Sequence, residues 1–379
     1  MTNWSELPSD LLALIAKRLV CMEHFLAFGA VCTSWLLAAD KNNFEPSQLQ
    51  PPWLMLGKMK NKTFREFLSL TTHKIYRFPI RDANGKKCLA SQGWLFAIGK
   101  NLDINLVHPL SGARVPLPQM HTLKDSDRLF DCPGFHFIYK AILSANNPND
   151  LRVAIFYGNG INKVAFCKVG EETWKTVEAY PSCACHDLLY YKGQFFGVDI
   201  LARIWVFNHE NLNAQVISTI PSEFLANHGN SMIRKPWQYF ERFYLVESAG
   251  SLLAVSREGK ICGHDYGTTG FRVFELDVED GMWKRVNSLG NRALFLGHNS
   301  SFSIQVTSNS GCKADCIYFT DDYYCFSSYQ ESHRRKGKDQ GIYNMGDHGS
   351  FEQHFRGETH HCDNPSIWIE PTFCRVKSR

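Results

Sequence analysis

The sequence predicts a small all-α module followed by an all-β domain, and the pattern of the all-β part favours a β-propeller. Three observations lead to this expectation. Apolar residues recur with a helical period up to about Asp40. From about Pro51 onward they recur with the period of two that is typical of strands. A unit made of a strand, an acidic turn and a tryptophan also occurs twice in the all-β part, as repeated sheets would produce.

Residues 1–40 predict three short helices. The apolar residues of the first helix share one face and are Leu11, Leu12, Ile15 and Leu19. The second helix would carry Phe25, Phe28, Val31 and Cys32, and the third would carry Trp35 and residues 36–39. Charged residues interrupt the apolar ones, which argues against a signal peptide. Because so short a module makes a small core, we expect a partner to cover its apolar face.

The residues from Lys41 to Pro52 are polar and contain prolines, which indicates a boundary. We therefore divide the chain into a helical module at 1–45, a linker at 46–52 and a propeller at 53–379. Turn dipeptides such as Asn84-Gly85 and Asp280-Gly281 separate the clearest short strands. These strands are predicted at 93–98, 152–158, 194–198, 203–208, 251–256, 271–276 and 316–320.

Two kinds of repeat support the propeller. Residues 163–177 align with 272–286, and each segment ends in Trp-Lys-x-Val. A glycine turn precedes an apolar strand at Gly93, Gly193 and Gly250. Blades of four short strands around an axis would give this pattern, and closing the ring protects the sheet edges. A pair of β-sandwiches is the alternative.

Composition narrows the class of protein. The net charge of +4 and the isoelectric point near 8.3 are too mild to indicate nucleic-acid binding. No uncharged apolar run reaches the ~18 residues of a membrane span, so we expect no membrane association. The 13 cysteines are an odd number without a framework spacing, which favours reduced thiols in the cytoplasm or nucleus.

The N-terminal module resembles an F-box, the helical unit that docks on the Skp adaptor of SCF ubiquitin ligases. The resemblance is carried by the opening Leu-Pro, the apolar helical face and the closing Val-Cys-x-x-Trp. It implies a Skp-type adaptor as partner and, through it, cullin and RING subunits. The adaptor-binding residues that it implies are Leu7, Pro8, Leu11, Leu12, Ile15, Leu19, Phe28, Val31, Cys32 and Trp35.

The rest of the chain resembles the plant F-box proteins whose C-terminal half is a KIB-type, kelch-like β-propeller. The matching segments are PPWLML (51–56), CHDLLYYKGQFFGVD (185–199), KDQGIYNMGD (338–347) and PSIWIEP (365–371). This resemblance implies a non-catalytic substrate receptor, without a cofactor, that holds a target protein for ubiquitination. Two alternatives stay open: an adaptor that acts without ubiquitination, and a propeller that binds a small molecule or catalyses a reaction.

Several cysteine and histidine groups could in principle bind metal, because zinc favours these ligands. Their spacings lack a CxxC pair, so we predict structural cysteines and no metal site. The groups considered are Cys312, Cys316, Cys325 and His333; Cys183, Cys185 and His186; and HHCDNP at 360–365.

Other motifs also have simple structural interpretations. No HExxH, nucleophile elbow or phosphate-binding loop occurs, which argues against an enzyme. The basic run HRRKGK (333–338) could be a nuclear localisation signal, but a solvated loop is the simpler interpretation. Trp174 and Trp283 occupy equivalent repeat positions, so we expect them to pack between blades. The target-binding residues are unknown from sequence; loops at 257–270 and 327–340 are the candidates.

Overall fold

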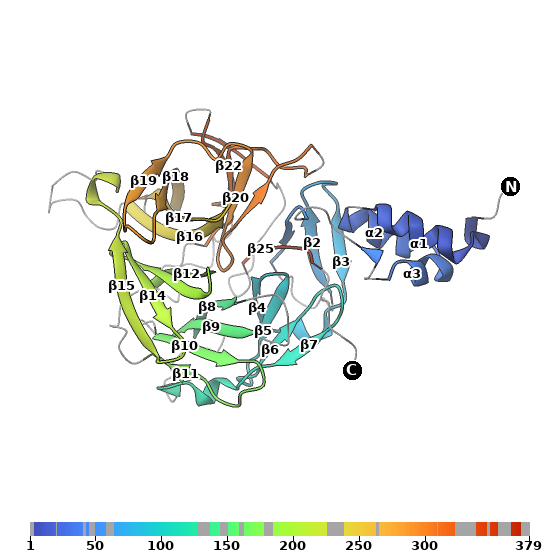
Figure 1. Ribbon diagram of the computed structural model, residues 1–379, viewed down its shortest axis with the longest axis horizontal. Helices are drawn as coiled ribbons and strands as arrows, with labels where there is room; N and C mark the ends of the chain where they lie inside the picture. Colours follow the sequence, from blue (N-terminus) through green and yellow to red (C-terminus); the bar gives the residue numbers. More distant parts are fainter. Residues whose placement is uncertain are drawn as a thin grey trace.

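A computed structural model describes residues 4–19, 21–40, 43–44, 50–57, 64–126, 137–144, 151–158, 163–177, 185–225, 239–262, 265–308, 310–322, 339–346, 349–354 and 365–372. Six β-sheets form a ring, and a group of short helices lies beside one of the sheets (Figure 1). In these residues no helix is long and apolar enough to cross a membrane. The chain is therefore a six-bladed β-propeller with a helical N-terminal module, and the β-sandwich alternative is wrong.

The helical module consists of η1 (Trp4–Glu6), α1 (Ser9–Arg18), α2 (Met22–Gly29) and α3 (Thr33–Ala38). Helix α3 packs against both α1 and α2. Val31 and Cys32 were expected in the second helix, but α2 ends at Gly29 and both residues lie in the turn that follows. The chain has to reverse there so that α3 can pack back on α2, and a β-carbon on Gly29 would lie only 3.0 Å from the Ala39 β-carbon.

Each blade is an antiparallel sheet, apart from one parallel pair in blade 6. Blade 1 contains β25 (Ile367–Ile369), β1 (Trp53–Met55), β2 (Arg65–Ser69) and β3 (Ile75–Phe78). Blade 2 contains β4 (Lys87–Ser91), β5 (Trp94–Ile98), β6 (Ile104–Val107) and β7 (Arg114–Pro116). Blade 3 contains β8 (Ile138–Leu143), β9 (Arg152–Tyr157), β10 (Lys163–Lys168) and β11 (Lys175–Thr176).

The second half of the ring follows the same plan. Blade 4 contains β12 (Cys185–Tyr191), β13 (Gln194–Asp199), β14 (Arg203–Asn208) and β15 (Asn213–Thr219). Blade 5 contains β16 (Tyr239–Ser248), β17 (Ser251–Cys262), β18 (Asp265–Leu276) and β19 (Trp283–Val286). Blade 6 has the order β21 (Phe302–Gln305), β20 (Arg292–Leu296), β22 (Cys316–Phe319), β23 (Gly341–Asn344) and β24 (Ser350–Glu352).

The two ends of the chain close the ring in blade 1. Strand β25 comes from the C-terminal end and pairs with β1, with Trp53 opposite Ile369. Around the axis, contacts run from β25 to β4, then to β8, β12, β16 and β21. The PSIWIEP segment is thus the strand that completes the first blade. Pairing the first and last strands leaves no open edge between these two ends of the propeller.

The repeats seen in the sequence occupy equivalent places in the blades. Gly93, Gly193 and Gly250 each stand in the two-residue turn between the first and second strands of a blade. Each glycine and the residue before it have positive φ, as in the type I′ turns that suit right-twisted hairpins. Trp174 and Trp283 lie between the third and fourth strands or at the start of the fourth. The indole of Trp174 donates to the Pro118 carbonyl of the preceding blade, and that of Trp283 donates to Ser218. The prediction that they pack between blades is confirmed.

The sixth blade departs from the repeat. The chain enters at β20, passes to the inner strand β21, and then crosses back so that β22 lies parallel to β20. This insertion gives blade 6 five strands. The kelch-like type of the propeller stays a prediction, because sheet order alone does not define a propeller subfamily.

The prediction of a loop at 257–270 is wrong. Residues 257–262 belong to β17 and residues 265–270 belong to β18, and they continue the ladder with Arg257 opposite Phe271. Phe240 lies opposite Gly259, where a β-carbon would meet its ring at 2.1 Å. The aromatic ring therefore covers a glycine across the strand pair, which stiffens the extension. We call residues 257–262 and 265–270 the β17–β18 arm. Of the other expected loop, 327–340, only Asp339 and Gln340 are described.

The helical module and blade 1 share one apolar core. Leu12, Phe25 and Phe28 are buried together with Trp53 and Phe67. The buried carboxylate of Glu23 in α2 accepts a hydrogen bond from the Trp53 indole at 3.1 Å and one from the Tyr76 hydroxyl at 3.4 Å. The module is therefore fixed to the propeller by packing and by hydrogen bonds, in addition to the chain connection.

Replacing Glu23 by alanine should destabilise this junction. The indole N–H of Trp53 would stay buried without its acceptor, which costs about 1–3 kcal/mol. We expect a loss of this size in the free energy of unfolding, measured by urea denaturation. Glu23→Gln keeps an acceptor and should lose less, and Glu223→Ala at an exposed position should change little. Equal stability of Glu23→Ala and Glu223→Ala would contradict the proposed role of this contact.

Candidate functional site

Exposed apolar side chains are concentrated on the helical module. Of the 13 exposed large apolar residues in the described part of the chain, seven lie between Trp4 and Leu37. We call them the helical apolar patch: Trp4, Leu11, Leu14, Ile15, Val31, Leu36 and Leu37. Leu36 and Leu37 are 61% and 76% exposed. Large exposed apolar surfaces on a folded domain usually mark an interaction site.

The ten adaptor-binding residues expected from the sequence fall into two groups. Pro8, Leu11, Ile15 and Val31 are exposed. Leu12 and Phe28 are buried in the core shared with blade 1, and the remaining four are partly buried: Leu7, Leu19, Cys32 and Trp35. Trp35 packs on Phe28, and its indole donates to the Trp4 carbonyl. The buried members hold the module together, whereas the exposed members are available to a partner.

Four members of the helical apolar patch were missed by the sequence reasoning. The apolar period predicts one packed helical face, and Trp4, Leu14, Leu36 and Leu37 are not among the residues that it selects. A helix that packs on one side and binds a partner on the other carries apolar residues on both. Leu11, Leu14 and Ile15 follow the spacing i, i+3 and i+4, which was the available signal.

A second candidate site lies on the propeller axis. A cavity of about 320 Å³ opens there, and every blade contributes to its wall. The inner strands supply Ser91, Leu143, Tyr190 and Glu247 at or near their ends, and Glu370 follows β25. We call this cavity the axial mouth. It contains two carboxylates and, in its described lining, no lysine, arginine or histidine.

Glu370 has a shifted pKa in the axial mouth. Burial and the nearby charge of Glu247 raise the pKa of Glu370 to about 7. Hydroxyl groups of the walls form hydrogen bonds between blades: Ser301 donates to Asp187, and Ser303 shares a hydrogen bond with Ser248. Beneath them Asp187 forms a buried ion pair with Lys140 at 2.5 Å. The axial mouth is therefore a preformed acidic pocket, and the charged residues beneath it, Lys140 and Asp187, neutralise each other.

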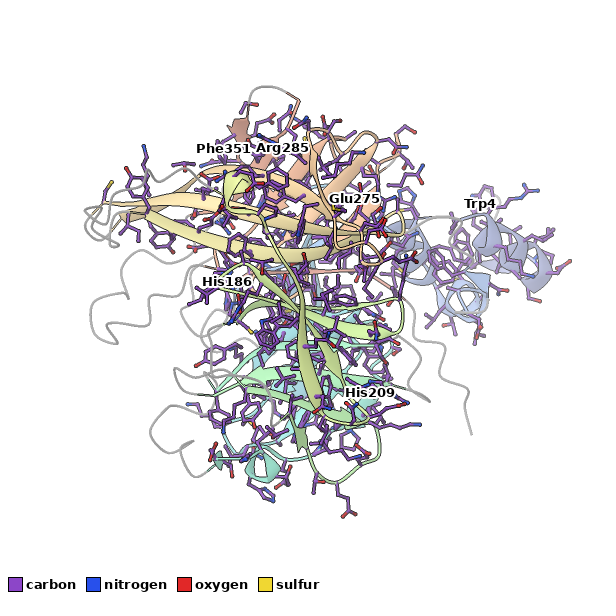
Figure 2. The ribbon with its side chains drawn as sticks, turned by 60° about the vertical axis from the view of Figure 1, so that its left-hand side comes forward. Trp4, His186, His209, Glu275, Arg285 and Phe351 are labelled. Carbon is purple, nitrogen blue, oxygen red and sulfur yellow. The ribbon has the colours of Figure 1, made fainter. Side chains whose placement is uncertain are left out.

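The axial mouth lies toward the helical module. Glu370 directly follows Ile369, which pairs with Trp53, and Trp53 contacts Glu23 of α2. Figure 2 shows Glu275 on the side of the propeller that faces the helices, whereas His186 and the β17–β18 arm lie on the other side. Glu275 accepts a hydrogen bond from Ser251, close to the end of β16 that lines the mouth.

The opposite face carries a buried ionic cluster at the base of the β17–β18 arm. Arg257, only 1% exposed, lies 2.8 Å from an oxygen of Asp322 and 2.9 Å from one of Asp339. Arg242 contacts the other Asp322 oxygen at 3.1 Å, and the Tyr244 hydroxyl donates to the same carboxylate. Every one of these groups has partners within the cluster. Its contacts join β16 and β17 of blade 5 to residues of blade 6.

The propeller matches a known protein family. The family model described as "KIB1-4 beta-propeller" matches residues 67–344, which is most of the chain. The chain belongs to the KIB1-4 β-propeller family. The KIB-type resemblance found in the sequence is thereby confirmed.

Several proteins with sequences similar to this KIB1-4 family member come from Arabidopsis thaliana. A protein named "Putative F-box protein At1g65770" is 27% identical and covers 85% of this chain and 90% of its own length. "F-box protein At2g26160" is 25% identical, and the match covers 84% of this chain and 96% of that protein. "F-box protein SKIP23" is 22% identical, and the match covers 86% of this chain and 85% of that protein. The chain is thus similar, over nearly its whole length, to plant F-box proteins.

The cysteine and histidine groups of this KIB1-4 protein fit structural roles where they are described. Cys316 is buried in β22, and burial raises the pKa of its thiol to about 11. Burial likewise raises the pKa of Cys312 to about 12. No group of three or more metal-ligating side chains gathers within the described ranges. Cys183, Cys325, His333 and residues 360–364 lie outside those ranges, as does the basic run at 333–338.

His186 has a structural partner in the neighbouring blade. Its Nδ1 accepts a hydrogen bond from the Phe243 amide at 3.1 Å. Burial, with a smaller contribution from Arg242, lowers the pKa of His186 to about 3, so the ring is neutral. The neutral imidazole therefore acts as an acceptor that links β12 to β16, and Cys185 beside it is partly buried in the same strand.

Proposed function

We propose that this protein is the substrate-recognition subunit of an SCF-type ubiquitin ligase. The observation that carries the proposal is the helical apolar patch, which leaves seven large apolar side chains exposed on a module fixed to a propeller. The names of the relatives support an F-box adaptor role. In this proposal the patch binds a Skp-type adaptor, which brings the cullin and RING subunits.

The protein would contribute position rather than chemistry. The adaptor would bind the module, and the propeller would hold a target near a ubiquitin-charged enzyme, so that the reaction gains from proximity. Because α2 shares a core with blade 1, the distance between the adaptor and the target would be fixed. We infer a non-catalytic role in ubiquitin-dependent protein degradation, in the cytoplasm or the nucleus.

Variants of the helical apolar patch test the adaptor assignment. Leu11→Asp combined with Ile15→Asp should abolish binding to the Skp adaptor, because each charge enters an apolar interface at a cost of several kcal/mol. Co-purification with the adaptor measures this, and we expect a loss of at least tenfold. Leu12 is unsuitable for the test because it is fully buried, so a charge there would damage the fold.

The matched control places the same chemistry on the propeller. Leu201 and Met282 are 60% and 68% exposed, so Leu201→Asp with Met282→Asp should leave adaptor binding intact. Full adaptor binding by the Leu11→Asp/Ile15→Asp protein, or equal losses in both double variants, would refute the assignment. Adaptor binding without recruitment of the cullin would favour the alternative of a protein-binding adaptor that acts without ubiquitination.

The axial mouth keeps the ligand-binding alternative open as a second candidate function. Cavities of roughly this size with a few convergent polar groups are typical of ligand sites. A pocket with two carboxylates at the centre of a rigid ring is such an arrangement. Its position on the side of the helical module also makes it a reasonable place for a target to dock.

A further inference from the structure

We propose that the axial mouth is the specificity pocket for a basic side chain, an arginine or a lysine, presented by the target protein. This inference rests on the proposed function and adds the chemistry of the target. The acidic residues Glu247 and Glu370 line the cavity, and none of its described lining residues is a lysine, arginine or histidine. A cation from outside would supply the missing charge.

The carboxylates are held where a bound side chain would meet them. Glu370 follows β25 in blade 1, and Glu247 lies near the end of β16 in blade 5, so two separate blades present acids to one cavity. The backbone amide of Gly250 donates to Glu247 at 2.8 Å and orients it. A guanidinium group has five donors in a planar fork and can engage carboxylates on both sides.

The remaining wall suits the stem of a long basic side chain. Leu143, Leu189 and Phe302 line the cavity together with Tyr190. The methylene groups of arginine and lysine pack well along apolar surface while their charged heads reach a polar one. The hydroxyls of the wall are already committed between blades, so they add little competing demand for hydrogen bonds.

The neighbouring charged groups are otherwise occupied. Lys140 is paired with Asp187 below the cavity, and Lys87 donates to the Ile138 carbonyl. Arg292 donates to Ser248 and Ser303. The His108 Nε2 lies 3.4 Å from the Thr372 hydroxyl on the rim. Burial, together with the smaller effect of the Glu247 charge, raises the pKa of Glu370 to about 7.

The pH dependence of cation binding follows from this pair. Glu370 is largely protonated below its pKa of about 7 and ionised above it. Binding of a cation favours the ionised form, so affinity should be about tenfold higher at about pH 8 than at about pH 6. Binding should also release a proton near neutral pH. An apolar or neutral ligand would show neither effect.

The test uses the full-length protein and small amides as probes. Arginine amide should bind with a dissociation constant in the millimolar range, measured by calorimetric titration at both pH values. Citrulline amide has the same shape without the charge and should bind at least tenfold more weakly. Glu370→Gln should remove most of the affinity for arginine amide and its pH dependence, and Glu247→Gln should weaken binding. The matched control, Glu275→Gln, changes an acid outside the cavity lining and should bind as the native protein does.

Each other outcome overturns the inference. Absence of arginine-amide binding, equal binding of citrulline amide, or unchanged binding by Glu370→Gln would each do so. Spermidine serves as the test for a free polyamine: if it binds at least tenfold more tightly than arginine amide, the pocket takes a small polyamine rather than a side chain. Adaptor binding by Glu370→Gln should be normal, so failure here leaves the adaptor assignment standing, and only the patch variants can refute that assignment.

Discussion

Replacing Asp322 by alanine should destabilise the propeller by about 3–5 kcal/mol, because the change takes the shared counter-ion from the buried Arg257 and the partly buried Arg242. Asp322 is only 2% exposed and contacts both Arg257 and Arg242. Breaking one side of a buried pair is costly, since the remaining charge stays out of water. The loss should appear in the urea concentration at the midpoint of unfolding.

Two controls separate the charge from the substitution itself. Asp280→Ala removes an exposed carboxylate in the turn before β19 and should change stability by less than about 0.5 kcal/mol. Asp322→Asn keeps the shape of the side chain and removes its charge. It should therefore lose most of the stabilisation that the Asp322→Ala variant loses. If Asp322→Asn is as stable as the native protein, the cluster contributes through packing alone.

The destabilisation should also depend on pH. Burial alone would raise the pKa of Asp322, but Arg242, Arg257 and the Tyr244 hydroxyl outweigh burial and hold its pKa below the ordinary value. A carboxyl with a lowered pKa stabilises the folded state above its unfolded pKa, and this contribution is lost as pH falls through the folded pKa. The difference between native protein and Asp322→Asn should therefore be largest near neutral pH and shrink in acid, below about pH 4.

Residue patterns predicted the features that recur from blade to blade and missed those that occur in one blade only. The turns at Gly93, Gly193 and Gly250 and the tryptophans at 174 and 283 recur, and each occupies an equivalent place in its blade. The crossing that makes β22 parallel to β20 occurs in one blade only, so no repeated sequence pattern predicts it. The glycines and polar residues of the β17–β18 arm predict a loop, but the structure continues the β17–β18 ladder through them.

The axial mouth could not be found from local sequence for a physical reason. Glu247 and Glu370 are far apart along the chain and meet only because the ring closes through β25. The buried Lys140 gave a partial signal, since a lysine stands inside an otherwise apolar strand, IYKAIL. The helical patch was partly predictable because i, i+3 and i+4 spacing is local. Its division into packing and binding residues depends on blade 1, which the module's own sequence does not contain.

Full-length protein carrying Leu11→Asp and Ile15→Asp should capture its target and protect it from degradation. The adaptor would no longer bind the helical apolar patch, while the propeller would still bind the target. Deleting the module would be a poorer test, because Trp53 and Phe67 pack in a core with Leu12 and Phe25, and a truncated propeller would expose them. The two aspartates avoid this, since they replace exposed residues and leave that core in place.

Expression of this double variant should raise the abundance of the target several-fold, as measured by quantitative mass spectrometry after affinity purification. Native protein should capture the same target at comparable levels only when the proteasome is inhibited. Full-length Glu370→Gln should give the reverse result: it should keep the adaptor and lose the target, because the axial mouth would no longer bind the target's basic side chain. If the Leu11→Asp/Ile15→Asp protein loses its target together with the adaptor, the propeller is not an independent receptor. If the target is captured but its abundance stays unchanged with native protein and variant alike, the protein acts as an adaptor without ubiquitination.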